Sequence, residues 1–197
     1  MEQISRATPK ILKIDASGMP QQWLNIDEAI SYYATDMVLY ELGSPVITYR
    51  GGMNRITQKQ SEITTNSIIA IKGKVSKKSD YARVPKLANE TLFERDRYVC
   101  AYCGGLFHRE HLSREHIIPK GQGGQDIWTN VVTACKHCNS AKGCRTLEQS
   151  RMSLIYLPYT PDRYENFILR QGTRRILADQ MEFLLNGVSK NSRLRTS

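Results

Sequence analysis

Four of the five cysteines form two short pairs, Cys100 with Cys103 in the run CAYC and Cys135 with Cys138 in the run CKHC. Each C-x-x-C turn lets two thiolates reach one ion, and two turns complete a closed tetrahedral site of four sulfurs. We therefore predict a structural zinc site. Disulfides are the first alternative, which a reducing compartment disfavours, and a redox C-x-x-C is the second, which would not occur doubled. Cys144 is predicted to be an ordinary small side chain.

Polar residues that could hydrolyse a phosphate ester lie between and just after these pairs. Glu115 and His116 are adjacent in a strand-like run, so their side chains point to opposite faces. A neutral His116 imidazole can accept a proton from water. The Glu115 carboxylate and the Asn139 amide offer oxygen ligands, which suit Mg²⁺ or Mn²⁺ better than zinc. Such a sparse ligand set predicts weak binding of the ion until nucleic acid arrives.

The runs CAYCGG (residues 100–105) and SREHIIPKGQGGQDIWTNVVTACKHCNSAKG (residues 113–143) resemble the HNH endonucleases. The resemblance implies a ββα-metal fold with a strand over residues 112–118, a loop, a strand over residues 131–135 and a helix from about His137. It also implies that Asn130 ties the loop to the strand and orients His116. A weaker similarity, in the runs LFERDRYVC and RRILADQMEFL, is typical of a bacterial HNH subfamily.

Two departures from the family pattern concern the metal ligands. Many relatives carry Asp where this chain has Glu115, and the longer side chain could shift the ion. The last letter of the motif is Asn139 rather than His, a variant that the family also uses and that favours Mg²⁺.

The residues and the resemblance together predict a metal-dependent endonuclease acting on DNA, with His116 as general base and Glu115 and Asn139 as ligands of the catalytic ion. One active site cuts one strand, so a monomer should nick, and a double-strand break needs a dimer or two events. Two alternatives stay open: a zinc-ribbon protein that binds nucleic acid without cutting it, and an enzyme of the same family that cleaves RNA.

Basic residues are concentrated outside the cysteine frame. The net charge is +9, and residues 50–88 hold nine basic and two acidic side chains. Such a concentration favours a polyanionic partner. Lys142, one helical turn after Asn139, is predicted to meet a phosphate. The full set of predicted nucleic-acid contacts is Lys72, Lys74, Lys77, Lys78, Lys120, Lys136, Lys142, Arg174 and Arg175.

The patterning predicts an α+β chain in three parts: a small N-terminal α+β unit over residues 1–88 with a basic second half, the HNH domain over residues 89–150, and a helical extension over residues 151–197 with a basic tail. In the first part we expect strands at 11–16, 38–41, 46–50 and 68–72, a polar stretch at 51–66, and a helix capped by Asp27. In the last part, Thr160-Pro161 predicts the start of a helix that ends at Gly172.

The last part of the chain also carries a stripe of apolar residues on one helical face. It is predicted to dock on the body of the protein, with a homodimer as the alternative; its members are Leu177, Met181, Leu184, Leu185 and Val188. Because the sequence has neither a membrane-length apolar run nor a block typical of a signal peptide, we expect no membrane partner and a cytoplasmic location.

Overall fold

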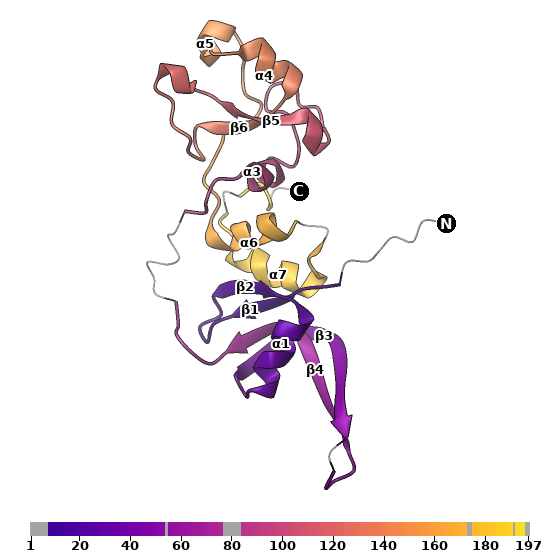
Figure 1. Cartoon of the computed structure of the whole chain (residues 1–197). Coiled ribbons are helices and arrows are strands. Elements are labelled where there is room, and N and C mark those ends of the chain that lie inside the picture. The colour runs from indigo at the N-terminus through magenta and orange to yellow at the C-terminus, as the bar shows by residue number, and fades with distance from the viewer. Residues whose placement is uncertain (1–7, 54, 77–83, 173–174, 191, 196–197) are drawn as a thin grey trace, which may run out of the picture. The chain divides into compact units, whose positions relative to one another are not determined.

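The computed structural model describes residues 8–53, 55–76, 84–172, 175–190 and 192–195, and these adopt an α+β fold (Figure 1). Contacts group the chain into two units, one of Met1–Tyr81 with Gln171–Gly187 and the other of Ala82–Arg170 with Val188–Ser197. This division differs from the three parts drawn from the sequence, because the C-terminal residues contribute to both units. We call the first the N-terminal unit and the second, which contains the runs that resemble HNH endonucleases, the nuclease unit.

The N-terminal unit is a four-stranded sheet in the order β2-β1-β4-β3. Its strands are β1 (Ile11–Ile14), β2 (Pro20–Leu24), β3 (Val38–Met53) and β4 (Gln60–Ile71). β1 runs parallel to β4, and the β1–β2 and β3–β4 pairs are antiparallel. Aliphatic side chains from the strands and the helix form the core: Ile11, Leu24, Ala29 and Ile69.

The helix of this unit, α1 (Ile26–Ala34), begins with a reciprocal capping box. The Asn25 side chain accepts a hydrogen bond from the Glu28 N–H at 2.8 Å, and the Glu28 carboxylate accepts one from the Asn25 N–H at 2.8 Å. Two otherwise unpaired N–H groups are satisfied in this way. The prediction of Asp27 as the cap was therefore wrong, since Asp27 lies within the first turn.

The hairpin of β3 and β4 is longer than the sequence predicted. The strands expected at residues 38–41 and 46–50 are one strand, and most of the supposed polar stretch belongs to the hairpin, whose pairing extends to Met53↔Gln60. Cross-strand hydrogen bonds hold this ribbon together without a buried face, so a search for apolar runs misses it.

The nuclease unit contains a two-stranded antiparallel sheet followed by a helix. β5 (Leu112–His116) pairs with β6 (Val131–Cys135), from Leu112↔Cys135 to His116↔Val131, and α4 (Lys136–Lys142) follows directly. This order is the one implied by the resemblance. Between the strands lies the short 3-10 helix η2 (Lys120–Gln122), and before them lies η1 (Arg109–His111).

An apolar cluster joins the hairpin of the nuclease unit to the preceding helix, α3 (Asn89–Arg95). Its buried members are Leu92, Phe93, Leu112, Trp128 and Val131. A short helix, α5 (Leu147–Ser150), follows α4 and is capped by Thr146. The hairpin on which the predicted site residues lie is thus held from one side by α3.

The C-terminal part of the chain contains α6 (Arg163–Gln171) and α7 (Ala178–Gly187). The Asp162 carboxylate accepts a hydrogen bond from the Glu165 N–H at 2.8 Å, so Asp162 caps α6 in place of the predicted Thr160. After α6, Gly172 has a φ of +78°, a left-handed conformation that favours glycine. None of the described helices is long and apolar enough to cross a membrane.

Helix α7 docks on the sheet of the N-terminal unit through polar side chains. Asp179 accepts hydrogen bonds from the Ser44 N–H and the Ser67 hydroxyl, both at 2.7 Å. Gln180 donates to the carbonyl groups of Lys10 and Ser67. In the apolar stripe, Leu184 is fully buried within this chain, as the docking interpretation predicted.

Candidate active site and metal centre

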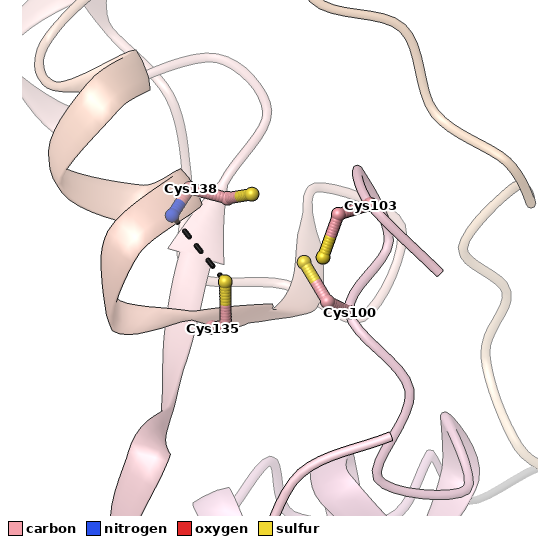
Figure 2. Close-up of side chains that lie close together, drawn as sticks. All are labelled: Cys100, Cys103, Cys135 and Cys138. Atoms are coloured by element: carbon pink, nitrogen blue, oxygen red, sulfur yellow. Dashed lines mark hydrogen bonds between the residues drawn. The ribbon is translucent and has the colours of Figure 1, made fainter. Parts of the chain in front are cut away.

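The four paired cysteines converge on one point. Their sulfur atoms all lie within 4.8 Å of one another (Figure 2). Cys100 and Cys103 come from the turn after α3, whereas Cys135 ends β6 and Cys138 lies in the first turn of α4. Three of the four are buried. A tetrahedral Zn²⁺ fits these four sulfurs, and such an ion would join the end of α3, β6 and α4.

Local hydrogen bonds favour the thiolate form at Cys100, but not at every cysteine of the cluster. Burial alone would raise the pKa of Cys100, but backbone N–H groups at Cys103 and Cys135 lower it to about 7. Burial raises the pKa of Cys138. A zinc ion binds cysteine as the thiolate and displaces its proton. The positive charge of the ion would therefore offset the repulsion between four thiolates held close together. Cys144 is exposed and lies outside the cluster.

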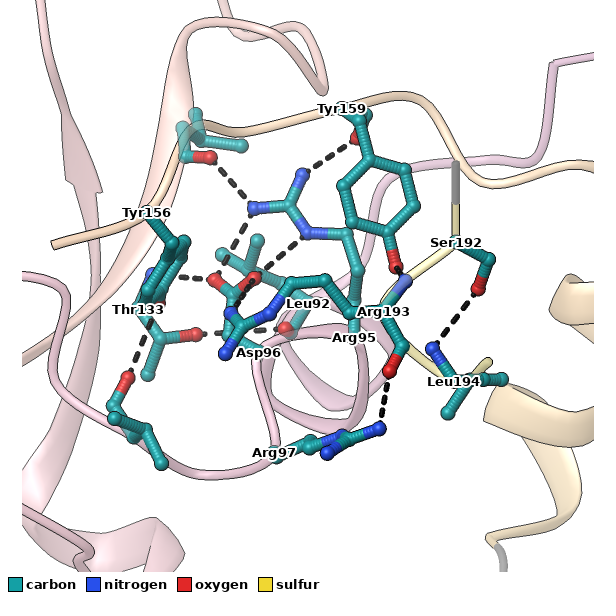
Figure 3. Close-up of polar contacts among 12 residues, drawn as sticks. Leu92, Arg95, Asp96, Arg97, Thr133, Tyr156, Tyr159, Ser192, Arg193 and Leu194 are labelled. Carbon is teal, nitrogen blue, oxygen red and sulfur yellow. Dashed lines mark hydrogen bonds and ion pairs between the residues drawn. The ribbon is translucent and has the colours of Figure 1, made fainter. Parts of the chain in front are cut away.

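Beneath β6 lies a fully buried ion pair, Arg95 with Asp96 (Figure 3). The Arg95 guanidinium donates twice to the Asp96 carboxylate, at 2.9 and 3.1 Å. Its other donors reach the carbonyl groups of Trp128, Val131 and Tyr159 at 2.8 to 2.9 Å. All five N–H donors of the arginine are thus used, which is the condition for burying such a charge.

This network fixes the strand that leads to the metal site. The Asp96 carboxylate accepts a hydrogen bond from the Thr133 N–H at 2.8 Å, in the middle of β6. The Arg193 guanidinium lies 3.9 Å from Asp96 and 3.9 Å from the centre of the Tyr156 ring, which draws the last residues of the chain into the network. Sequence reasoning missed this network, for which the Arg-Asp pair in the run LFERDRYVC was the only signal.

A cavity of about 590 Å³ opens beside the hairpin and α4. The three residues predicted to perform the chemistry, Glu115, His116 and Asn139, all line it. Lys120 and Lys136, two of the predicted phosphate contacts, line the same cavity and are exposed. A phosphate ester could therefore reach the imidazole, the carboxylate, the amide and two cations in one place.

Glu115 is 5% exposed, and its carboxylate accepts a hydrogen bond from the Lys142 ammonium at 2.5 Å. Burial raises the pKa of Glu115, and the Lys142 cation opposes that rise. Lys142 itself is fully buried and also donates to the His116 carbonyl at 2.8 Å. The prediction that Lys142 meets a phosphate was therefore wrong, because this face of α4 packs on β5 rather than facing the cavity.

The His116 imidazole has a partner that the sequence analysis missed. Its Nε2 lies 2.8 Å from the Asp126 carboxylate, which also accepts from Arg114 at 2.7 Å. Burial alone would raise the pKa of Asp126, but the hydrogen bonds from Arg114 and His116 lower it. A carboxylate at Nε2 holds the proton on that nitrogen and leaves the Nδ1 lone pair as the acceptor. In the sequence, the only indication of this partner was that Asp126 lies in the loop just after the GQGG run.

Asn130 closes the loop between the two strands. Its amide donates to the carbonyl groups of Ile118 and Gln125 at 3.0 and 2.8 Å, and its side-chain oxygen accepts from the Ile118 N–H at 3.0 Å. A Cβ at Gly124 would lie 1.7 Å from the Ile118 carbonyl oxygen, so only glycine fits there. These contacts secure the strand end that holds His116.

Two residues that line the cavity, Glu115 and Asn139, carry oxygen atoms of the kind that ligate hard divalent cations. The Asn139 side-chain nitrogen donates to the Ser113 hydroxyl at 2.7 Å, which fixes the amide group at the cavity wall. A carboxylate has lone pairs for several partners, so Glu115 can accept from Lys142 and still ligate an ion. Carboxylate and amide oxygens are ligands typical of Mg²⁺ and Mn²⁺.

The predicted nucleic-acid contacts outside the cavity lie in varied surroundings. Lys72 is paired with Asp36 at 2.7 Å. Lys74 and Arg175 are exposed. Lys77, Lys78 and Arg174 lie outside the residues that the structure describes.

The cysteine frame, hairpin and helix together match a known class of nuclease domain. Residues 100–155 match the family model described as HNH endonuclease. A 51-residue segment is 37% identical to the CRISPR-associated endonuclease Cas9 of Corynebacterium diphtheriae. That segment is 25% of this chain and 5% of the relative, so the likeness concerns the nuclease segment alone.

Proposed function

We propose that this protein is a metal-dependent endonuclease that hydrolyses phosphodiester bonds of DNA. One observation carries the proposal: His116, with Nε2 held by Asp126, lines the same cavity as the Glu115 carboxylate and the Asn139 amide. The match of residues 100–155 to the HNH endonuclease family supports a nuclease at the level of the family. Substrate, metal and residue roles are the parts that we propose.

His116 acts as the general base. With the proton on Nε2 bound to Asp126, the Nδ1 lone pair takes the proton from the attacking water. The Asp126 carboxylate then stabilises the imidazolium that forms. Asn130 keeps the end of β5 in place through its bonds to Ile118, so the imidazole stays directed at the substrate.

Glu115 and Asn139 would hold the catalytic ion. Bound Mg²⁺ or Mn²⁺ supplies positive charge to the phosphate and to the leaving oxygen. Because the buried Lys142 ammonium already compensates the charge of Glu115, the two ligands attract an ion weakly on their own. The substrate phosphate would supply further oxygen ligands, and Lys120 and Lys136, which line the same cavity, would neutralise the adjacent phosphates.

The stoichiometry of cutting follows from one active site in each chain. A monomer nicks one strand, and a homodimer or two successive events would break both. We propose that the protein acts in the cytoplasm on duplex DNA. Sedimentation of the native chain with and without DNA decides the oligomeric state.

The test is nicking of a supercoiled plasmid with Mg²⁺. We expect His116→Ala to lower the rate about 10²- to 10⁴-fold, the range for loss of a general base. His111→Ala is the matched control, because His111 is exposed and does not line the cavity. Equal, metal-independent nicking by the native chain and His116→Ala would contradict the proposal.

Two further measurements separate the two alternatives. A zinc protein that only binds nucleic acid would retain the plasmid in a gel-shift experiment without ever nicking it. An RNA-cleaving enzyme would prefer RNA in a panel of duplex DNA, single-stranded DNA and RNA of one sequence.

A further inference from the structure

The hairpin of β3 and β4 extends beyond the rest of its sheet (Figure 1). β1 pairs with β4 only from Leu12↔Ile68 to Ile14↔Ala70, whereas β3 and β4 stay paired out to Met53↔Gln60. We call the described residues of this stretch, 47–53 and 55–63, the arm. Seven residues from Ile47 to Met53 span about 23 Å at the rise of a β-strand. The arm is therefore a two-stranded ribbon long enough to contact another molecule.

The surface of the arm combines positive charge with exposed hydrocarbon. Residues 47–63 contain three basic side chains and one acidic side chain, Glu62, which pairs with Arg50 at 3.0 Å. Arg55 and Lys59 lie near the tip and are exposed. Between them Ile56 is 93% exposed, and Met53 nearby is 65% exposed. The tip of the arm therefore presents apolar side chains and cations to solvent together, a combination that can serve a contact with another molecule.

The edge of β3 is poorly suited to another β-strand. Its pairing with β4 has four register shifts, one of them between Arg50 and Met53 within the arm, where Gly51 and Gly52 lie. Pro45, which pairs with Asn66, lies in β3 just before the arm. Bulges and proline are the features that prevent edge-to-edge association. A second copy of this chain is thus not the occupant that the arm favours.

The dimensions and charge of the arm fit DNA. A two-stranded ribbon enters the major groove of B-form DNA, which is about 12 Å wide, whereas the minor groove is about 6 Å wide. The major groove of A-form RNA is too narrow to admit it. In the sequence of the tip, Arg55 and Lys59 flank Ile56. The major groove combines phosphates at its edges with base edges that include thymine methyl groups, so it offers partners for both kinds of side chain.

We propose that the arm inserts into the major groove of DNA, with Arg55 and Lys59 on phosphates and Ile56 against base edges. This inference rests on the proposed function for the choice of DNA as the polyanion. It adds a second contact region, on the N-terminal unit, to a protein whose cavity would bind only the scissile phosphate and its neighbours.

The charge part of the proposal is tested by binding to a duplex at several salt concentrations. All proteins carry His116→Ala, so that no cleavage interferes. Arg55→Glu with Lys59→Glu should weaken binding at least tenfold at 0.1 M salt. It should also reduce the slope of log affinity against log salt by about 1.8, at roughly 0.9 for each phosphate that the variant no longer neutralises.

The matched control carries Lys10→Glu with Lys190→Glu, which changes the net charge equally at two exposed positions outside the arm. We expect the control to lose little affinity and to keep the slope. Equal losses in the two double variants would overturn the proposal, because they would reflect net charge alone.

The apolar part is tested with duplexes that contain thymine or deoxyuracil, which lacks the methyl group. In the His116→Ala background, the chain with Ile56 should prefer the thymine duplex by about threefold, close to the value of one buried methyl group. Ile56→Ser should abolish this preference and leave the salt slope unchanged. A preference for the thymine duplex that survives Ile56→Ser would overturn the proposal. So would a variant that binds DNA normally but sediments with a different oligomeric state, because the arm would then contact a second copy of the chain.

These outcomes are separable from those of the proposed function. If the native chain never cuts DNA but the arm variants lose binding as described, the inference stands and the nuclease proposal fails. If the native chain cuts DNA and the arm variants bind like the control, only the inference fails.

Discussion

Both units have an apolar core, but the nuclease unit also buries ion pairs, which the described part of the N-terminal unit does not. In the first, Arg95, Asp96 and Lys142 are fully buried, and the cysteine cluster adds a metal site. In the second, Ile11 and Ile69 represent a conventional aliphatic core. Directional bonds fix atoms to within a few tenths of an ångström, while apolar packing fixes only a shape. The unit that we propose aligns a base, a cation and a phosphate is the one with the buried ion pairs.

The stability of a unit with buried ion pairs depends on each member of each pair. A buried charge that loses its partner is strongly destabilising, whereas an aliphatic core loses stability in proportion to the volume removed. The two units should therefore respond differently to loss of metal, loss of one charge and change of pH. Trp128 is buried in the nuclease unit and Trp23 lies on β2, so their fluorescence can report the two units separately.

The largest difference should follow removal of the metal site. Cys135→Ser should abolish zinc binding and cooperative folding of the nuclease unit, because a structural zinc contributes on the order of 10 kcal/mol. The N-terminal unit should stay folded. Metal analysis, with Trp128 fluorescence in a Trp23→Phe background, measures the first effect, and Trp23 fluorescence in a Trp128→Phe background measures the second.

Cys144→Ser is the control for this experiment, since Cys144 is exposed and lies outside the cluster. It should keep both zinc and folding. Unaltered unfolding of the nuclease unit in Cys135→Ser would show that the zinc is not structural.

The next effect should come from Lys142→Met. This change leaves the Glu115 carboxylate buried without its cation, which should destabilise the nuclease unit by about 3 kcal/mol. Urea unfolding followed by Trp128 fluorescence measures the loss. The double variant Lys142→Met with Glu115→Gln should regain most of it, because no buried charge stays unpaired.

Lys136→Met, on the exposed face of the same helix, is the matched control and should change stability by less than about 0.5 kcal/mol. If Lys142→Met were equally neutral and instead lowered the salt dependence of DNA binding, Lys142 would be a phosphate contact after all.

In the N-terminal unit the comparable polar contact is Asp15. Burial alone would raise its pKa, but hydrogen bonds from Ser17, Ser76 and Met19 lower it to about 2. A carboxyl with a lowered pKa stabilises the fold above the unfolded value of about 4, and this contribution disappears as the pH falls to about 2. Asp15→Asn should therefore cost about 2 kcal/mol at neutral pH, and the difference should vanish in acid.

Urea unfolding, followed by Trp23 fluorescence at several pH values between 7 and 2, measures this difference in the free energy of unfolding. Asp27→Asn serves as the control, because Asp27 is exposed in the first turn of α1 and should matter by only a few tenths of a kcal/mol. If Asp15→Asn lowered the free energy of unfolding equally at every pH, the effect would come from altered hydrogen bonding or packing and not from the carboxylate charge.

The smallest expected effect separates catalysis from stability within the nuclease unit. Asp126→Ala should lower kcat about tenfold with little change in KM, because Nε2 of His116 loses its acceptor. The stability of the unit should hardly change, since the Asp126 side chain is 39% exposed. Asp126→Asn should recover part of the rate, as its side-chain oxygen can still accept from Nε2. A raised KM with unchanged kcat would instead place Asp126 in substrate binding.

Local spacing predicted the cysteine cluster and the order of strand, loop, strand and helix well. A C-x-x-C turn brings two sulfurs together whatever the rest of the chain does, so Cys100 and Cys103 could be paired by inspection. The capping residues Asn25 and Asp162 were each missed by two positions, which is the ordinary uncertainty of helix ends.

Long-range pairing was harder to predict. Asp126 lies ten residues from His116, and nothing in that distance distinguishes it from any solvated loop residue. The arm was missed because its strands are stabilised by each other rather than by an apolar face. Lys142 was misplaced because the sequence does not show which face of a short helix turns towards a buried carboxylate.

The sequence by itself determined which atoms are available: four thiols at ligand spacing, an imidazole beside a carboxylate, and two amides at intervals that suit a hairpin and a helix. Only the tertiary structure decided which of these atoms share a cavity and which are already occupied by Lys142, Asp126 or Ser113. The physical reason is that ligand spacing is a property of a few consecutive bonds, whereas the pairing of buried charges depends on segments that only folding brings together.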